Sequence, residues 1–169
     1  MRPTDADVGA LLEALSAAGV AHVVVGGVAA VMHGAPLPTR DLDIVPDPDP
    51  GNLDRLHALL VRLGAVFREV GTRELAVRRT DLSGEGQVLT RTSLGPLDVL
   101  LRVHDGRGYA ELLPRSICLV ADGLAVHVLD LPALIELKAG TGRARDRLAV
   151  PVLAALLDAG RNRGSSDGG

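Results

Sequence analysis

Apolar residues recur along the first third of the chain with two different periods, which separate helices from strands. Residues 8–18 carry apolar side chains at helical spacing, and Gly19 follows as a stop. Residues 21–25 are a short β-branched run, typical of a buried strand. Gly26 and Gly27 end this run before helix-compatible residues return. The pattern predicts a helix, a strand, a glycine turn and a second helix.

A second strand and a longer helix are expected next. Residues 41–45 read as the strand, and the proline-rich residues 46–51 end it because proline donates no ladder hydrogen bond. Asn52 is the expected N-cap of a helix whose leucines repeat at helical spacing, and Gly64 ends that helix.

Residues 65–101 read as strands separated by glycine-containing turns, and we expect these strands to pair in the antiparallel sense. The four expected strands are residues 65–70, 74–78, 88–93 and 97–101. A short helix at residues 109–113 precedes a hairpin over residues 116–128. Asp122 and Gly123 form its turn, because an Asp-Gly pair suits a tight hairpin.

The C-terminal part is predicted to be helical, over residues 132–140 and 143–157, with Pro151 kinking the second helix or starting a new one. Residues 1–160 are expected to form one domain, and the polar, glycine-rich residues 161–169 a disordered tail. The predicted fold class is α/β (α+β): a mixed, mainly antiparallel central sheet with flanking helices and a helical C-terminus.

Composition narrows the possible functions. Of the 169 residues, 47% are hydrophobic but only 1% are aromatic, so the core must consist of Val, Leu, Ala and Ile. Phe67 and Tyr109 are the only aromatic side chains, which argues against gripping single-stranded nucleic acid by stacking. The net charge of -3 gives no global attraction for a polyanion. A single cysteine, Cys118, excludes an intrachain disulfide and a cysteine-based zinc cluster.

The N-terminal residues are partly acidic and have helical spacing, unlike a secretory signal, and the apolar residues 20–35 are too short to span a bilayer. We therefore expect a cytoplasmic protein that does not contact a membrane.

Three aspartates in apolar strand segments are the candidate chemical groups. Asp41 and Asp43 are two residues apart, so in a strand they share one face, and Asp98 lies in another apolar run. A buried, unpaired carboxylate is costly, whereas Mg2+ binds carboxylates together with phosphate oxygens. The alternative is that Asp41 ends a strand, Asp43 is a solvated edge residue and the three acids are unrelated.

The Gly26-Gly27 turn presents unhindered backbone amides at the start of a helix, which suits a phosphate group, although a plain tight turn would have the same sequence. Lys138 is the only lysine in the chain, and a compact ammonium suits a phosphate contact. It would equally suit a solvated position near a helix end. The sequence leaves two roles open for Arg40, a contact to phosphate or an exposed charge at the end of a strand.

The segment HVVVGGVAAVMHGAPLPTRDLDIV, residues 22–45, resembles the signature of the DNA polymerase beta-type nucleotidyltransferase superfamily. That signature is a strand, a Gly-Gly or Gly-Ser turn, a helix, and then Asp-hydrophobic-Asp on the next strand. The Thr39–Asp43 run and the later LPALIELKAGTGRARDR are similar to the minimal bacterial nucleotidyltransferases, a group that includes abortive-infection toxins. The resemblance implies a nucleotidyltransferase-like fold and transfer of NMP from an NTP such as ATP.

The resemblance also implies roles for particular residues. Asp41, Asp43 and Asp98 would bind Mg2+, or Mn2+ in its place, and Asp98 would also accept the proton of the attacking hydroxyl. Those three aspartates and Lys138 are the expected catalytic residues. The expected nucleotide-binding residues are Gly26, Gly27, Thr39, Arg40, Lys138 and Asp146.

Two positions depart from the pattern of the group. Leu37 stands where an Arg is common, and Gly27 where many active members have Ser. These departures keep open a noncatalytic nucleotide sensor or partner-binding module on the same fold. If the chain is an enzyme, its acceptor is an RNA such as tRNA, a protein or a small molecule, and the sequence does not decide among them. The resemblance also suggests a toxin role with an antitoxin partner. The sequence does not fix the oligomeric state.

Overall fold

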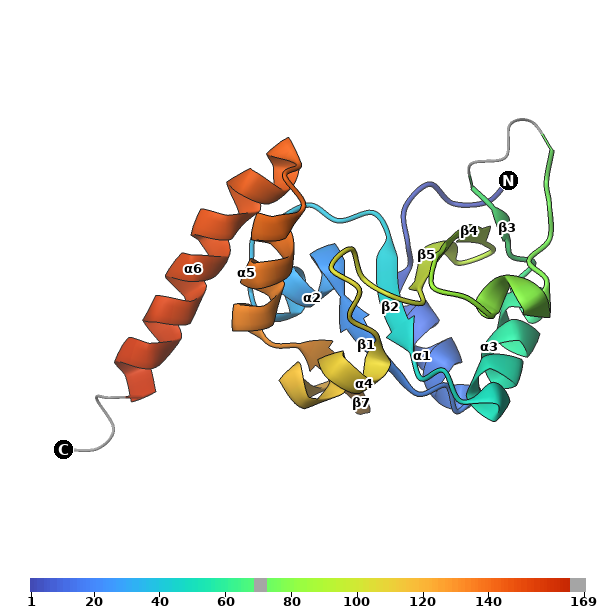
Figure 1. The fold of residues 1–169 in the computed structure, drawn as a ribbon, viewed down its shortest axis with the longest axis horizontal. Coiled ribbons are helices and arrows are strands. Elements are labelled where there is room, and N and C mark those ends of the chain that lie inside the picture. Colours follow the sequence, from blue (N-terminus) through green and yellow to red (C-terminus); the bar gives the residue numbers. More distant parts are fainter. Residues whose placement is uncertain (69–72, 165–169) are drawn as a thin grey trace.

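The computed structural model describes residues 1–68 and 73–164 and has a seven-stranded mixed sheet with helices on both sides (Figure 1). The strands lie in the order β3-β4-β5-β2-β1-β7-β6, and four of the six neighbouring pairs are antiparallel. The predicted fold class, a mainly antiparallel mixed sheet with flanking helices and a helical C-terminus, is confirmed. The strands are β1 His22–Val25, β2 Leu42–Pro46, β3 Val66–Phe67, β4 Gln87–Thr92, β5 Gly95–Leu100, β6 Ser116–Ala121 and β7 Leu124–Leu129.

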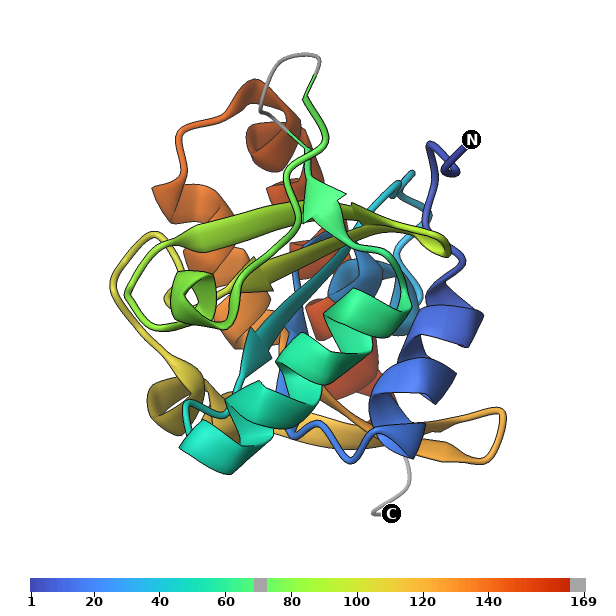
Figure 2. The same cartoon turned by 90° about the vertical axis from the view of Figure 1, so that its right-hand side faces the viewer.

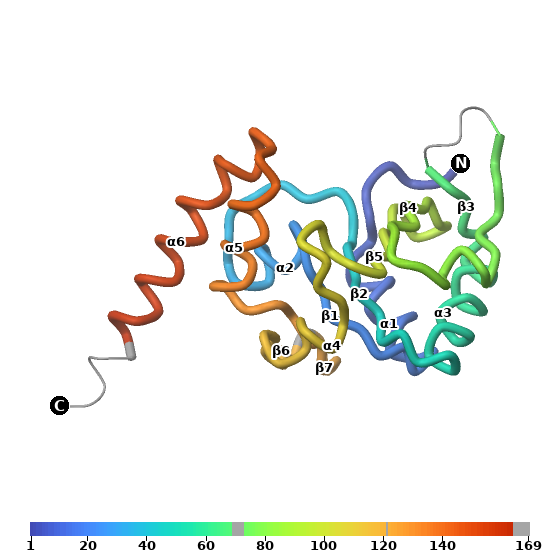
Figure 3. Tube along the Cα trace, viewed as in Figure 1, coloured from blue at the N-terminus to red at the C-terminus, as the bar shows by residue number. Residues whose placement is uncertain are grey.

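Helices cover both sides of this sheet. α2 lies between the sheet and the α5/α6 pair, whereas α1 and α3 pack together on the other side (Figures 1 and 2). A shorter helical segment, with α4 and η2, lies near β1 and β7 (Figure 3). The helices are α1 Val8–Ala17, α2 Gly26–Met32, α3 Pro50–Arg62, α4 Tyr109–Leu112, α5 Leu131–Gly140 and α6 Ala144–Gly164, with 3-10 turns η1 Arg79–Leu82 and η2 Leu113–Arg115.

The residues that flank Asp43 and Asp98 on the two central strands are buried and aliphatic. Leu42 and Ile44 of β2 have no exposed surface, and neither do Leu97 and Val99 of β5. The buried hydrophobic residues are Val, Leu, Ala and Ile, as the scarcity of aromatic residues predicted. A rigid aliphatic core of this kind fixes the strand ends that carry the polar groups described below.

The start of α3 differs from the prediction. Asp49, not Asn52, is the N-cap, and its carboxylate accepts a hydrogen bond from the Asn52 amide at 3.0 Å. Pro50 is the first helical residue, where its missing amide proton costs nothing. The buried Asn52 side chain instead bonds to the backbone of Ala21 and Asp47, so it ties α3 to the residue before β1 and to the loop after β2.

The region before β4 contains less strand than expected. Of residues 65–70 only Val66–Phe67 is a strand, and residues 69 and 70 lie outside the described part of the chain. Residues 74–78 form no strand beyond a single bridge between Ala76 and Val66. β3 is the edge strand of the sheet, and among the described residues β4 is its only partner strand, while residues 74–78 add no more than the bridge to Val66.

The C-terminal helix is longer than predicted. α6 contains Pro151 and continues to Gly164, so residues 161–164 are helical. Residues 165–169 of the expected tail lie outside the described part. Among the helices of residues 1–68 and 73–164, none combines the length and the apolar character that crossing a bilayer requires.

Candidate active site

The sheet register brings two of the three predicted acids side by side. Asp43 is the second residue of β2, and its neighbours across the sheet are Val25 of β1 and Asp98 of β5. β2 and β5 are parallel, so these two Cα positions are direct partners. Asp41 stands immediately before β2. The alternative of three unrelated acids is therefore wrong, because it required Asp98 to lie far from Asp43.

An arginine that the sequence did not single out joins this group. Arg68 follows β3, and its guanidinium donates from Nη2 to Asp98 Oδ2 at 2.6 Å. Its Nη1 lies 3.5 Å from Asp41 Oδ2. The only sequence signal was an arginine directly after an apolar run, and which acids it reaches follows from the order β3-β4-β5-β2.

Burial and mutual repulsion hold these carboxyls in an unusual electrostatic state. Burial, the charge of Asp41 and the charge of Asp98 raise the pKa of Asp43 to about 7, against a weaker opposing effect of Arg145 and Arg68. Burial also raises the pKa of Asp98 to about 6, where the Arg68 charge opposes it and Asp41 adds to it. Asp98 Oδ1 is buried and has no hydrogen-bond partner in the described part of the protein.

The arrangement and charge of the aspartates determine whether they suit a divalent cation. Across residues 1–68 and 73–164, no group of three or more His, Cys, Asp or Glu side chains is arranged as a metal site. Arg68 supplies the positive charge near Asp41 and Asp98 instead. Even so, an orphaned buried carboxylate oxygen and acids that repel each other are what a hard cation would satisfy. The donor set fits Mg2+.

The glycine turn packs directly against the acids. Gly26 has φ +69°, and a Cβ atom there would lie 2.2 Å from Asp43 Oδ2. A Cβ atom on Gly27 would lie 2.7 Å from the hydroxyl of Thr39. Glycine is thus required at position 26 for conformation and for space, whereas at position 27 a side chain would meet only Thr39. In the part of the chain described, no side chain caps α2, so its first backbone amides are available to a ligand.

Lys138 and Asp146 meet on the other side of the site. Lys138 Nζ lies 3.3 Å from Asp146 Oδ1, and the Thr141 hydroxyl donates to Asp146 Oδ2 at 2.6 Å. Burial would raise the pKa of Asp146, but the bond from Thr141 and the charge of Lys138 together lower it. The Lys138 side chain is only 14% exposed, so it is not a solvated residue at a helix end.

One cavity of about 850 Å3 connects these groups. The glycine turn, Thr39, Asp41 and Asp43 line it, and so do Arg68, Lys138 and Asp146. We call it the central cavity. Arg40 also borders it, but its side chain is 83% exposed and pairs with Asp5 at 3.7 Å. Every predicted site residue except Asp98 lines this cavity, with Arg40 at its outer rim, and Asp98 is bonded to the lining residue Arg68.

Solved structures with this architecture were found at low sequence identity. The lincosamide antibiotic adenylyltransferase LnuA, bound to lincomycin, superposes with a TM-score of 0.63 at 12% identity, covering 91% of this chain and 99% of that one. The antibiotic-resistance factor ANT(2'')-Ia, in complex with adenylyl-2''-tobramycin, superposes with a TM-score of 0.52 at 16% identity, covering 92% of this chain and 95% of that one. A Thermotoga maritima protein to which nucleotidyltransferase activity has been ascribed superposes with a TM-score of 0.54 at 15% identity, covering 85% of this chain and 88% of that one.

The chain has the nucleotidyltransferase-like fold. No protein-family model matches the sequence, and no curated protein matches it. At 12–16% identity the similarity concerns the fold, so the activity of this nucleotidyltransferase-like chain must be argued from its own cavity.

Proposed function

We propose that the chain is a Mg2+-dependent nucleotidyltransferase that transfers NMP from an NTP to an acceptor hydroxyl or phosphate. The observation that carries this proposal is the pairing of Asp43 with Asp98 on adjacent parallel strands, with Asp43 in contact range of the glycine turn. Acids next to free backbone amides provide a cation site beside a phosphate site. The folds of LnuA and ANT(2'')-Ia support the same chemistry.

The residues of the central cavity divide into two groups by what they would bind. Asp41, Asp43 and Asp98 would hold Mg2+, which when bound stabilises charge on the attacking and leaving oxygens. The amides after Val25 would hold the terminal phosphates of the NTP, and Asp98 would accept the proton of the attacking hydroxyl. Lys138, held by Asp146, would place its ammonium toward the phosphates.

Thr39 compensates for one departure from the resembled pattern. Gly27 lacks the hydroxyl that a Ser would carry there, but the Thr39 hydroxyl lies 2.7 Å from the point where a side chain at position 27 would begin. It donates to the Asp41 carbonyl at 3.2 Å and lines the central cavity. We assign Thr39 the hydroxyl contact to the triphosphate.

A noncatalytic nucleotide-binding module is the second candidate, and one observation favours it. Arg68 pairs with both Asp41 and Asp98, so a cation already occupies part of the space that Mg2+ needs. A permanently paired Arg68 would allow nucleotide binding without turnover.

Labelled NTPs with Mg2+ and a panel of acceptors separate the two candidates. The proposal expects label transfer by the wild-type chain and none by Asp98→Asn, together with Mg2+-dependent NTP binding by calorimetry. Nucleotide binding without transfer to any acceptor would favour the sensor. If Asp43→Asn bound Mg2+ and NTP as well as the wild type does, both candidates would fail.

A toxin role with an antitoxin partner stays a proposal from the resemblance alone. Growth arrest on induction of the wild-type chain, absent for Asp98→Asn, would support it. Normal growth of both strains would argue against it.

A further inference from the structure

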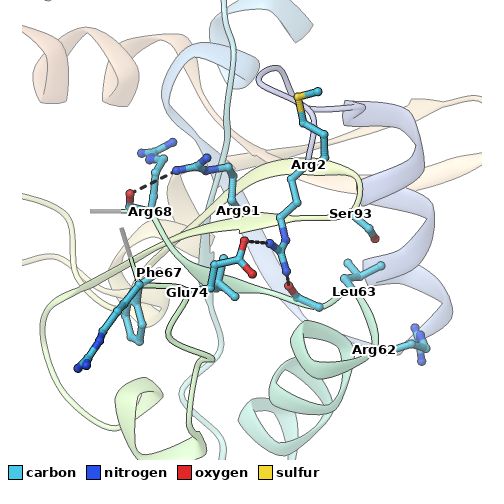
Figure 4. Close-up of a pocket in the computed structure, with 12 residues that line it drawn as sticks. Arg2, Arg62, Leu63, Phe67, Arg68, Glu74, Arg91 and Ser93 are labelled. Carbon is cyan, nitrogen blue, oxygen red and sulfur yellow. Dashed lines mark hydrogen bonds and ion pairs between the residues drawn. The ribbon is translucent and has the colours of Figure 1, made fainter. Parts of the chain in front are cut away.

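A second cavity, of about 790 Å3, lies at the β3/β4 edge of the sheet and is lined by five arginines. Figure 4 labels four of them, Arg2, Arg62, Arg68 and Arg91. Arg73 is the fifth, and Glu74 is the only acid in the lining. We call this cavity the arginine pocket. A chain with net charge -3 and 18 basic residues has concentrated a large share of them here.

Among the described residues, three of the five arginines have no ion-pair partner. Glu74 pairs with Arg2, which also donates to the Gly64 carbonyl at 3.0 Å. Within residues 1–68 and 73–164, no carboxylate pairs with Arg62, Arg73 or Arg91. These three side chains are exposed, so their planar guanidinium forks are accessible to a phosphate group, which accepts paired hydrogen bonds from them.

The arginine pocket adjoins the proposed catalytic acids. Arg68 and Arg91 line both cavities, and Arg91 Nη2 reaches the Arg68 carbonyl at 3.5 Å (Figure 4). Arg68 in turn bonds Asp98 at 2.6 Å. A group bound in the arginine pocket is thus one side chain away from the carboxylate that would accept the proton.

The order of the strands decides which reactant this pocket would serve. The glycine turn follows β1, whereas the arginine pocket is built on β3 and β4, beyond β2 and β5. In phosphoryl transfer the attacking and leaving oxygens lie on opposite sides of the phosphorus. With the leaving pyrophosphate at the glycine turn, the attacking hydroxyl approaches from the side of the arginine pocket.

We propose that the arginine pocket binds a phosphate group of the acceptor, so that the acceptor of this chain is a phosphorylated molecule. That the bound molecule is the acceptor depends on the proposed function. Binding of an anion depends on the arginine pocket alone. An acceptor carrying several ammonium groups would be repelled there. Small sugar phosphates and polynucleotide ends both carry such a phosphate group, and the probes below distinguish the two.

Binding measurements without NTP or Mg2+ test the pocket apart from the reaction. The probes are ribose 5-phosphate, a ten-nucleotide single-stranded RNA, and unphosphorylated ribose. The variant Arg62→Gln/Arg73→Gln alters two residues that line only the arginine pocket. Its matched control, Arg161→Gln/Arg163→Gln, removes the same charge from the last turn of α6, at the other end of the molecule (Figure 1).

The proposal expects the wild type and the α6 control to bind at least one phosphorylated probe, with no comparable affinity for ribose. The Arg62→Gln/Arg73→Gln variant should lose about tenfold or more in affinity for that probe. Preference for RNA with a steep salt dependence would identify a polynucleotide, and preference for ribose 5-phosphate a small acceptor.

Three outcomes would overturn the proposal. The wild type binds neither phosphorylated probe; the pocket variant binds them as the wild type does; or the pocket variant loses affinity for Mg2+-ATP, which would place the triphosphate in the arginine pocket. Unchanged Mg2+-ATP binding also shows that the variant is folded. If the nucleotidyltransferase function itself were wrong, no label transfer would occur, whatever the probes show.

Discussion

Arg68 satisfies one oxygen of the buried Asp98 carboxylate and leaves the other without a partner. The donated bond to Oδ2 is 2.6 Å long, while Oδ1 has no hydrogen-bond partner among the described residues. Arg68 therefore neutralises the acid cluster incompletely. The bond to Oδ2 helps the fold tolerate the grouped acids, and the unpartnered Oδ1 is still available as an oxygen ligand for a cation.

Removing Arg68 should expose its two effects. Arg68→Met leaves Asp98 buried without a counter-charge, so we expect a loss of about 2–4 kcal/mol in the free energy of unfolding without metal. The same change frees Asp41 and Asp98, so Mg2+ should bind more tightly than to the wild type and restore more stability. Thermal unfolding with and without Mg2+ measures both.

The control for this variant is Arg102→Met, which breaks an exposed pair with Glu85. It should change stability by less than about 1 kcal/mol and leave the response to Mg2+ unchanged. An Arg68→Met protein that Mg2+ stabilises no more than it does the wild type would show that Arg68 does not stand in for the cation.

The local sequence pattern predicted the aspartates of the site but not the arginine that pairs with them. Asp43 and Asp98 were recognisable because a charge inside an apolar strand needs compensation. Arg68 was not, because its contact with Asp98 depends on the strand order β3-β4-β5, which no local pattern encodes. Likewise the sequence predicted Asn52 as a helix cap, but its side chain is buried and bonds to the residue before β1 and to the loop after β2.

The raised pKa of Asp43 predicts a pH dependence of stability. Its folded pKa of about 7 lies above the ordinary 3.8, so the folded state binds more protons than the unfolded state between about pH 4 and pH 7. Without metal, this group therefore lowers the free energy of unfolding as pH rises through that window. Asp43→Asn should remove the loss, stabilising the metal-free protein by roughly 1–3 kcal/mol at pH 8 and little at pH 4.

Chelator-treated protein, unfolded with urea at several pH values, provides the measurement. Asp54→Asn, an exposed acid that pairs with Arg79, is the control and should show no such gain at pH 8. Asp43→Asn should also abolish nucleotidyl transfer, since a ligand is lost. A variant that is no more stable than the wild type at pH 8 would contradict the electrostatic account of the site.

Thr39 and Gly27 should behave as a coupled pair. Thr39→Ala removes the hydroxyl assigned to the triphosphate, so KM for the NTP should rise about tenfold. Gly27→Ser alone should be poorly tolerated, because its Cβ would lie 2.7 Å from the Thr39 hydroxyl. The double variant Gly27→Ser/Thr39→Ala relieves the clash and returns a hydroxyl, so KM should recover most of the loss. Additive effects in this cycle would refute the coupling.

Gly26 offers the sharpest test of the contact between the glycine turn and the acids. Gly26→Ala would place a methyl 2.2 Å from Asp43 Oδ2 at φ +69°, so steric overlap adds to backbone strain. Gly34→Ala is the matched control, because Gly34 has φ +94° but no atom within 4 Å of the added methyl. We expect Gly34→Ala to cost about 1–2 kcal/mol of stability and to keep Mg2+-NTP binding. Gly26→Ala should cost more and lose that binding, because Asp43 must move. Equal behaviour of the two variants would mean that the turn does not position Asp43.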